Sequence, residues 1–203
     1  ITKTMKHAAL FRRELLAWYR AEARDLPWRR TRDPYKIWLA EIILQQTRVD
    51  QGLPYYERYA AAYPTVEDLA KATEDQVLKL WEGLGYYTRA RNMHKTARII
   101  VEQYGGKVPA SAEVLQMLPG IGRYTAGAIA SIAFNERVPV LDGNVKRVLT
   151  RLFDLDGCID LPEVELELWI LAGTLVPQQK PGDFNQAMMD FGSLVCKPAA
   201  PLC

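Results

Sequence analysis

The chain has 203 residues, of which 49% are hydrophobic and 25% are charged, a composition typical of a soluble globular protein. No apolar run approaches the roughly 18 residues of a membrane span, and no signal peptide stands at the start, so we expect no membrane partner. The net charge of +2 is too small to indicate nucleic-acid binding by itself. The odd number of cysteines favours a reducing compartment over a disulfide framework.

Apolar periodicity and capping residues predict helices along the whole chain and no convincing pair of strands. Asp33-Pro34 is an N-cap followed by proline at the first helical position. Thr65-Val-Glu-Asp68 and Thr73-Glu-Asp-Gln76 resemble capping boxes, each opening a short helix. The other predicted helices are 8–23, 34–44, 53–63, 87–104, 112–117, 123–134, 144–155, 162–175 and 183–196. The predicted fold class is therefore all-α.

The most specific motif is Leu118-Pro-Gly-Ile-Gly122, which lies between two predicted helices. Gly120 and Gly122 allow a sharp turn and a close approach of the backbone to a partner. The next helix starts at Arg123, so its unpaired N–H groups and its positive dipole end favour binding of a DNA phosphate. The alternative is a plain turn between helices with glycine caps.

Glu41 is the one charge in the apolar run 37–44. A helix that is apolar nearly all round is buried, and burial raises the pKa of a lone carboxyl group. A carboxylic acid that stays protonated near neutral pH suits general-acid catalysis. The alternative is a structural glutamate that pairs with an arginine or caps a helix. The polar segment that follows, Gln45-Gln-Thr-Arg48, favours catalysis because it suits an opened duplex and its bases.

Asp142 opens the predicted helix 144–155, and capping is the ordinary role of an aspartate there. The helix 123–134 carries the chain about 18 Å away from the glycine-rich hairpin. Residues 135–141 span about 23 Å when extended, which is enough to bring Asp142 back to the mouth of the hairpin. We therefore expect its carboxylate to lie beside a nucleotide whose phosphate the hairpin holds.

Together, four segments resemble the endonuclease III superfamily and, within it, the MutY family of adenine DNA glycosylases. They are Glu41–Thr47, Trp81–Tyr87, Leu118–Thr125 and Asp142-Gly-Asn144, and the similarity runs from Asp25 to Cys203. The resemblance implies two helical lobes, 29–136 and 1–28 with 137–203, with a helix-hairpin-helix motif and double-stranded DNA bound in a cleft between them. It also implies a monomer that excises flipped adenine opposite 8-oxoguanine or guanine by acid-catalysed N-glycosidic cleavage.

The resemblance implies roles for individual residues. Glu41 would protonate adenine, Asp142 would stabilise positive charge on the sugar, and Tyr124 and Asn144 would complete the catalytic group. Tyr124 stands where bifunctional relatives have a lysine that forms a Schiff base, so we expect base removal without an efficient lyase step. The implied base-pocket residues are Arg24, Leu26, Trp28, Arg29, Gln46, Val49 and Gln186. The implied DNA contacts are Gln46, Thr47, Tyr86, Gly120, Gly122, Arg123, Thr125 and Lys146, with Gln46 and Tyr86 as wedges in the duplex.

Two bound groups follow from the same resemblance. Cys196 and Cys203 match the first spacing of Cys-x6-Cys-x2-Cys-x5-Cys, which binds a [4Fe–4S] cluster in the family. We expect the natural protein to continue past Cys203, so that the cluster is absent or incomplete in this chain. The backbone carbonyls of Gln116, Leu118 and Ile121 are expected to hold a monovalent cation or Ca²⁺. Such a protein would act at the nucleoid of a bacterium, or in the nucleus or mitochondria of a eukaryote.

Two alternatives stay open. An endonuclease III-like glycosylase for oxidised pyrimidines is the first, and Tyr124 and the segment that begins at Glu41 argue against it. The second is a non-catalytic helix-hairpin-helix module that only binds DNA. Such a module needs only the hairpin and two basic clusters, which are Arg89, Arg91, Lys95 and Arg98 in one segment and Lys146, Arg147 and Arg151 in another. It would leave a buried Glu41 with an energetic cost and no purpose.

Overall fold

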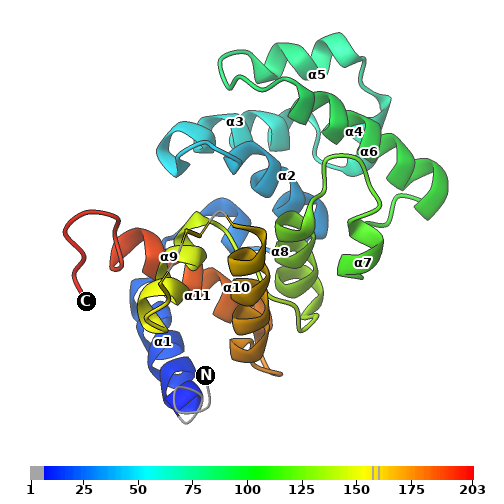
Figure 1. The fold of residues 1–203 in the computed structure, drawn as a ribbon. Coiled ribbons are helices and arrows are strands. Elements are labelled where there is room, and N and C mark those ends of the chain that lie inside the picture. Colours follow the sequence, from blue (N-terminus) through cyan, green and yellow to red (C-terminus); the bar gives the residue numbers. More distant parts are fainter. Residues whose placement is uncertain (1–6, 157, 160) are drawn as a thin grey trace. The chain divides into compact units, whose positions relative to one another are not determined.

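A computed structural model describes residues 7–156, 158–159 and 161–203, and the secondary structure within these ranges is entirely helical (Figure 1). The all-α prediction is thereby confirmed. The chain forms two compact units: a central unit, Pro27–Ile129, and a terminal unit, Ile1–Leu26 with Ala130–Cys203. The division falls inside helix α8 (Arg123–Phe134). The lobes expected from the sequence, 29–136 and 1–28 with 137–203, stay a prediction.

The central unit is organised around helices α2 and α6. Helix α6 packs against α4 and α5, and α2 packs against α3 (Figure 1). Its core includes Trp38, Tyr59 and Trp81, whose side chains are almost completely buried. The elements are η2 (Pro27–Arg29), α2 (Pro34–Leu44), α3 (Val49–Ala62), α4 (Val66–Lys71), α5 (Glu74–Trp81), α6 (Thr88–Tyr104), α7 (Ala112–Leu115) and the first part of α8.

The helix ends of the central unit follow the capping rules. The Asp33 side chain accepts a hydrogen bond from the backbone N–H of Tyr35 at 2.9 Å, as expected for an N-cap. Thr65 and Thr73 both form complete capping boxes, which confirms the two predicted helix starts. Gly105 ends α6 in the left-handed conformation, with φ of 60°.

Several helix limits differ from the prediction. Helix α3 begins at Val49, four residues before the predicted start at residue 53. The early start places Gly52 against α2, where a Cβ atom would lie 2.7 Å from Cδ2 of Leu44. A search for hydrophobic periodicity does not detect this close packing between α2 and α3. The predicted helices 112–117, 144–155 and 183–196 are observed as Ala112–Leu115, Gly143–Leu152 and Pro181–Leu194.

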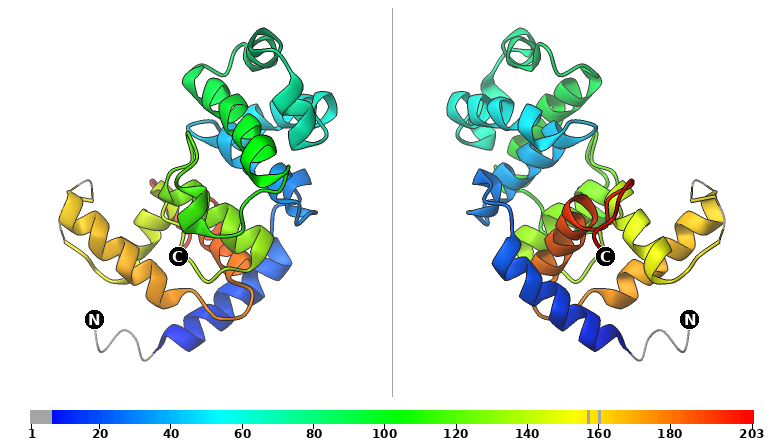
Figure 2. Two further views of the ribbon diagram at one scale, coloured as in Figure 1. Left: turned by 90° about the vertical axis from the view of Figure 1, so that its right-hand side faces the viewer. Right: turned by 90° about the vertical axis from the view of Figure 1, so that its left-hand side faces the viewer.

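The terminal unit is organised around α11, which packs against α1 and α9 (Figure 2). Two glycines allow α11 to pack closely, Gly192 against α9 and Gly182 against the end of α8. A Cβ atom at Gly192 would lie 2.7 Å from Cβ of Asn144, and one at Gly182 would lie 2.6 Å from Cα of Ile132. The helices are α1 (Ala8–Glu22), α9 (Gly143–Leu152), α10 (Pro162–Leu175), α11 (Pro181–Leu194) and the end of α8. Among the described helices, none has both the length and the apolar character that crossing a membrane requires.

Candidate functional site

Glu41 lies in the middle of α2, where every residue from 37 to 43 is buried. Its own exposure is 8%, which confirms the expectation that this carboxyl group is largely removed from water. In the first turn of α8, the Tyr124 hydroxyl donates a hydrogen bond to Oε2 of Glu41 at 2.8 Å. The contact fixes the orientation of the carboxyl group. Because a hydroxyl also accepts hydrogen bonds, the contact is compatible with an ionised or a protonated carboxyl.

The polar segment after α2 is anchored within the central unit. The side-chain amide of Gln45 donates a hydrogen bond to Oγ1 of Thr125 at 3.1 Å, and Thr125 is buried. The next residue, Gln46, is exposed and has a φ of 56°, in the left-handed region that non-glycine residues rarely occupy. Thr47 is partly exposed, and its hydroxyl donates a hydrogen bond to the carbonyl of Gln45 at 3.3 Å.

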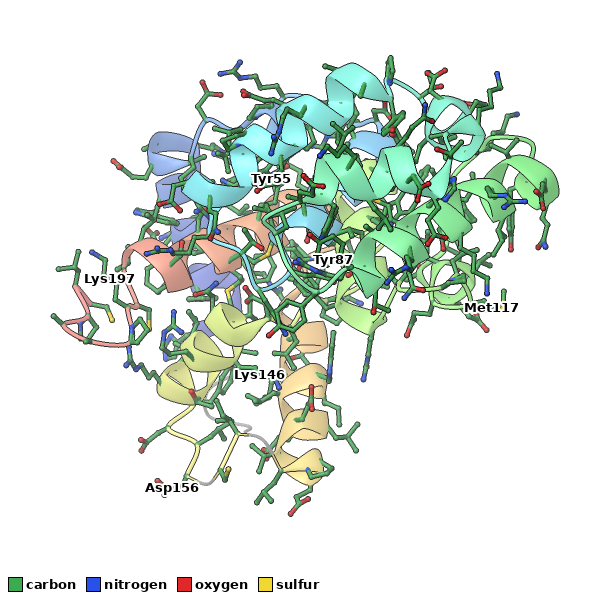
Figure 3. The ribbon with its side chains drawn as sticks, turned by 90° about the horizontal axis from the view of Figure 1, so that it is seen from above. Tyr55, Tyr87, Met117, Lys146, Asp156 and Lys197 are labelled. Carbon is green, nitrogen blue, oxygen red and sulfur yellow. The ribbon has the colours of Figure 1, made fainter. Side chains whose placement is uncertain are left out.

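The loop between α5 and α6 presents Tyr86, whose side chain is 70% exposed and whose φ is 47°. The Trp81 indole N–H donates a hydrogen bond to the Gly85 carbonyl at 2.9 Å, and the Tyr55 hydroxyl donates one to the Glu82 carbonyl at 2.8 Å. Figure 3 labels Tyr55 of α3 and Tyr87, the residue at the start of α6. The loop is therefore held at both ends while the ring of Tyr86 projects into solvent.

The glycine-rich hairpin is joined to α6. The Thr96 hydroxyl donates a hydrogen bond to the Pro119 carbonyl at 2.8 Å. Gly120 has a φ of 76°, and a Cβ atom there would lie 2.8 Å from Cβ of Asn92. By contrast, nothing lies within 4 Å of a Cβ atom built at Gly122. The two glycines are thus not equivalent, because only Gly120 is required by the local backbone and packing.

The hairpin also contains the three residues whose backbone carbonyls are expected to bind a cation. The Leu118 carbonyl accepts a hydrogen bond from the backbone N–H of Ile121 at 3.2 Å. The Gln116 amide donates one to the Ala112 carbonyl at 3.1 Å. Met117 is 70% exposed, and Figure 3 labels it. The expected role of the carbonyls of Gln116, Leu118 and Ile121 as cation ligands stays a prediction.

Asp142 is the N-cap of α9 in the terminal unit. Its Oδ1 accepts a hydrogen bond from the backbone N–H of Val145 at 2.7 Å, and its Oδ2 accepts one from the Asn144 amide at 2.9 Å. Asn144 in turn accepts a hydrogen bond from Nη2 of Arg147 at 2.8 Å. The capping role granted to Asp142 from the sequence is confirmed. The expected return of Asp142 to the hairpin stays a prediction.

The other expected site residues are divided between the two units. In the terminal unit, the Arg24 guanidinium pairs with the fully buried carboxylate of Asp190. The Lys146 ammonium, labelled in Figure 3, lies 3.1 Å from a carboxylate oxygen of Glu165. In the central unit, the Trp28 ring packs edge-on against Tyr56 with centroids 4.9 Å apart. Leu26 and Gln186 are also buried, Val49 begins α3, Arg29 ends η2 and Arg123 begins α8.

The C-terminal segment holds the two cysteines expected to bind a cluster. Cys196 is buried, and Nη1 of Arg151 lies 3.3 Å from its Sγ, whereas Cys203 is exposed. Within the described residues, no group of three or more His, Cys, Asp or Glu side chains is placed to hold a metal ion. Two thiolates do not complete the four that a [4Fe–4S] cluster takes, so the residues present do not fit the whole group.

Sequence reasoning missed Asp190 altogether, and it placed Arg89 in a basic cluster without predicting the contacts that the structure shows. Asp190 is the fully buried partner of Arg24, and the weak sequence signal for it is that it follows the apolar stretch Ala187–Met189 of α11. Arg89 contacts the segments that carry Gln46 and Tyr86. The sequence offers one indirect indication of these contacts. Helix α2 has no basic residue in its last turn, so the terminal carbonyls of α2 need a hydrogen-bond donor from another segment.

Comparison with known proteins gives a consistent picture. Residues 39–172 match the family model of the HhH-GPD superfamily of base excision DNA repair proteins. The adenine DNA glycosylase of Rattus norvegicus is 50% identical over 95% of this chain, which covers 39% of that protein. The adenine DNA glycosylase of Buchnera aphidicola subsp. Schizaphis graminum is 42% identical over 96% of this chain, which covers 56% of that protein. The chain therefore spans less than two thirds of the length of these relatives.

Solved structures share the fold. A thermostable thymine-DNA glycosylase has a TM-score of 0.86 and 33% identity, with 98% of this chain and 92% of that chain covered. A non-covalent complex of endonuclease III with DNA has a TM-score of 0.80 and 24% identity, with 98% of this chain and 90% of that chain covered. The second likeness concerns the fold alone.

Proposed function

The chain belongs to the HhH-GPD superfamily of base excision DNA repair proteins, and on that premise we propose that it excises adenine from double-stranded DNA. The proposed substrate is adenine opposite 8-oxoguanine or guanine. The observation that supports this most directly is a single carboxyl group in a buried helix, oriented by the Tyr124 hydroxyl at 2.8 Å. Identity of 42–50% with adenine DNA glycosylases over nearly the whole chain supports the choice of base.

In the proposed reaction, Glu41 acts as a general acid. The C1′–N bond breaks, its electron pair goes to the leaving adenine, and the proton of Glu41 neutralises a ring nitrogen of that base. Water then attacks C1′ and loses a proton, which leaves an abasic site. Tyr124 holds the Glu41 carboxyl in one orientation, so that its proton is directed at the base in the pocket.

Asp142 is proposed to stabilise the positive charge that develops on the sugar. Its carboxylate accepts both of the hydrogen bonds described for it, one from the Val145 N–H and one from the Asn144 side-chain amide. An ionised carboxylate is purely an acceptor, so this pattern suits it. A fixed negative charge beside an oxocarbenium-like transition state is the kind of preorganised electrostatic stabilisation that lowers such barriers. Asn144 would keep the carboxylate oriented towards the sugar.

The direct test is incubation with a duplex that carries one adenine opposite 8-oxoguanine, followed by alkali to cut any abasic site. We expect strand cleavage at that adenine and none in a duplex with cytosine opposite 8-oxoguanine. Parallel duplexes with thymine opposite guanine and with an oxidised pyrimidine test the two other glycosylase activities. Cleavage in either of these and none at adenine would overturn the proposal, and DNA binding without cleavage in any duplex would favour a non-catalytic module.

The absence of a lyase step is tested through Tyr124. Borohydride should trap little covalent complex with the natural sequence, because a phenol forms no Schiff base. Tyr124→Lys should give clear trapping, since an amine would then stand beside the sugar. Equal trapping by the two proteins would show that residue 124 does not face the sugar.

The remaining parts of the proposal concern bound groups and setting. Cys196 and Cys203 would supply two of the four thiolates of a cluster, and no step of the reaction is assigned to it. The hairpin carbonyls of Gln116, Leu118 and Ile121 would hold a monovalent cation or Ca²⁺ next to a DNA phosphate. The protein would act as a monomer where DNA resides, in the nucleoid of a bacterium or in the nucleus or mitochondria of a eukaryote.

A further inference from the structure

Arg89 joins two segments of the central unit through backbone carbonyls. Its Nη1 donates hydrogen bonds to the carbonyls of Ile42, at 3.2 Å, and of Gln45. Its Nη2 donates hydrogen bonds to the carbonyls of Leu84, at 3.2 Å, and Gly85, at 3.3 Å. One guanidinium therefore binds the end of α2 with one nitrogen and the loop between α5 and α6 with the other.

Arg89 stabilises the end of α2, whereas its positive charge is unfavourable at the start of its own helix, α6. The last carbonyls of a helix have no partner within the helix and carry partial negative charge, and α2 has no basic residue in its last turn. Arg89 is the second residue of α6, where the helix dipole disfavours a cation. Its placement thus serves the carbonyls of the neighbouring segments.

The environment of Arg89 holds the guanidinium in one place. Burial lowers the pKa of Arg89 from its ordinary value, and the group lies 5.0 Å from the centroid of the Trp81 ring and 5.7 Å from that of Tyr86. The Nε–H is buried and has no hydrogen-bond partner among the described residues. A guanidinium with fixed fork geometry reaches carbonyls on both sides, which a lysine ammonium on a flexible stem does not.

Each bound segment carries one exposed side chain in a rare backbone conformation. Gln46 follows the bound carbonyl of Gln45 and has a φ of 56°, and Tyr86 follows the bound carbonyl of Gly85 and has a φ of 47°. Non-glycine residues keep such conformations only where the surrounding structure imposes them. In this molecule the Arg89 guanidinium binds the carbonyl immediately before each of the two residues.

We propose that Arg89 is a positioning residue that holds Gln46 and Tyr86 at a fixed separation, so that both enter the duplex together when a base is extruded. The inference rests on the proposed function, because it assumes a base that leaves the stack. Arg89 itself touches neither the base nor the sugar. Its effect is on the preparation of the substrate and not on cleavage of the glycosidic bond.

The test uses Glu41→Gln as background, so that excision is too slow to disturb the measurement, and a duplex with 2-aminopurine opposite 8-oxoguanine. The fluorescence rise at saturating protein reports unstacking of the 2-aminopurine. We expect Arg89→Met to reduce this rise at least fivefold and Arg89→Lys to reduce it by a smaller factor. Arg98→Met is the matched control, because Arg98 lies on the same helix, is 61% exposed and pairs only weakly with Glu102, at 3.9 Å. It should leave the rise unchanged.

A double-mutant cycle separates positioning from a general loss of structure. In the variant Gln46→Ala/Tyr86→Ala, adding Arg89→Met should reduce the remaining rise less than twofold, because the residues through which Arg89 acts are gone. An equal reduction with and without these side chains would overturn the proposal, as would a full rise in Arg89→Met. If Arg89→Met does not fold, as judged by circular dichroism, the same cycle with Arg89→Lys decides the question.

Failure of this inference is distinguishable from failure of the proposed function. The fluorescence assay measures base unstacking without excision, whereas the alkali assay on adenine opposite 8-oxoguanine measures excision with Glu41 present. Adenine excision with an unstacking signal that does not depend on Arg89 would leave the proposed function in place and overturn only the role of Arg89. No unstacking with Arg89 in place would also overturn that role.

Discussion

The two carboxyl groups proposed for the reaction stand in opposite structural settings. Glu41 lies in the interior of a buried helix of the central unit, where its carboxyl accepts a hydrogen bond from the Tyr124 hydroxyl. Asp142 lies at the start of α9 in the terminal unit and caps that helix through the Val145 N–H. Both carboxyl groups have hydrogen-bond partners within the protein, but Asp142 caps a helix end, whereas Glu41 stands in the middle of a helix that Asp33 caps.

The position of a carboxyl group within its helix indicates a chemical role more clearly for Glu41 than for Asp142. A carboxyl group buried in the middle of an apolar helix has an energetic cost that calls for an explanation, so Glu41 is a strong candidate for chemistry. An N-cap aspartate needs no such explanation, and its chemical role depends on where the substrate lies. A substitution that keeps the cap while removing the charge is thus required at Asp142.

Glu41→Gln should have the largest effect. The amide keeps the size of the side chain and cannot donate an acidic proton, so single-turnover excision of adenine should fall by roughly 10²–10⁴-fold. Affinity for the duplex, measured by fluorescence anisotropy, should change by no more than a few-fold. Glu57→Gln, an exposed position on α3, is the control and should excise at the normal rate. A normal excision rate in Glu41→Gln would remove Glu41 from the mechanism.

Asp142→Asn should slow excision by roughly 10²-fold, because an amide cannot balance positive charge on the sugar. Asparagine caps helices about as well as aspartate, so the thermal midpoint should change little. The control is Asp33→Asn, which makes the same change at the N-cap of α2 and should leave the rate unaffected. Equal slowing by both substitutions would show that the charge at residue 142 has no specific role.

Gly120→Ala and Gly122→Ala test whether the backbone of the hairpin in the central unit binds DNA independently of the Glu41 carboxyl. At Gly120, alanine meets Asn92 and a positive φ, which destabilises the hairpin by about 1–2 kcal/mol or more. Binding should weaken by roughly tenfold for duplexes with and without a mispair, because phosphate contacts carry no sequence information.

Gly122→Ala is the matched comparison, since a Cβ atom there meets nothing within 4 Å. Its unfolding midpoint should equal that of the natural sequence. A loss of stability as large as that of Gly120→Ala would contradict the distinction between the two glycines. A loss of affinity in Gly120→Ala confined to DNA that contains the mispaired adenine would indicate that the hairpin belongs to the base pocket.

The smallest expected effect is a loss of folding stability at alkaline pH, caused by buried tyrosines of the central unit. Burial, as the largest cause, raises the pKa of Tyr35 and of Tyr59 above the ordinary value of 10. The folded state thus keeps these protons to higher pH than the unfolded state, so the associated stability is complete below about pH 10 and is lost as the pH rises further.

The measurement is urea unfolding of the protein between pH 9 and pH 12, followed by circular dichroism. Tyr35→Phe should show a smaller fall in the free energy of unfolding over this range, because one of the two groups no longer titrates. Tyr104→Phe, at the end of α6, serves as the control and should follow the natural sequence. An identical fall in Tyr35→Phe and the natural sequence would rule out Tyr35 as a source of the alkaline instability.

Local sequence patterns were enough to predict which segments are helical and that Glu41 is buried. Signals for these are local: a cap such as Asp33 or Thr65 acts within one turn, and an apolar run such as 37–44 is buried wherever the helix packs. The Glu41 carboxyl could be singled out for the same reason, since one charge in an apolar helix is visible without knowledge of its neighbours.

The residues that contact these groups could not be predicted in this way, because they come from distant parts of the chain. Tyr124 is 83 residues from Glu41, Asp190 is 166 from Arg24, and Arg89 is 44 from Gln45. The need for a small residue at position 52 and the difference between Gly120 and Gly122 also depend on side chains from other helices, Leu44 and Asn92. Hydrogen bonds and close packing form between residues adjacent in space, and a linear pattern records only residues adjacent along the chain.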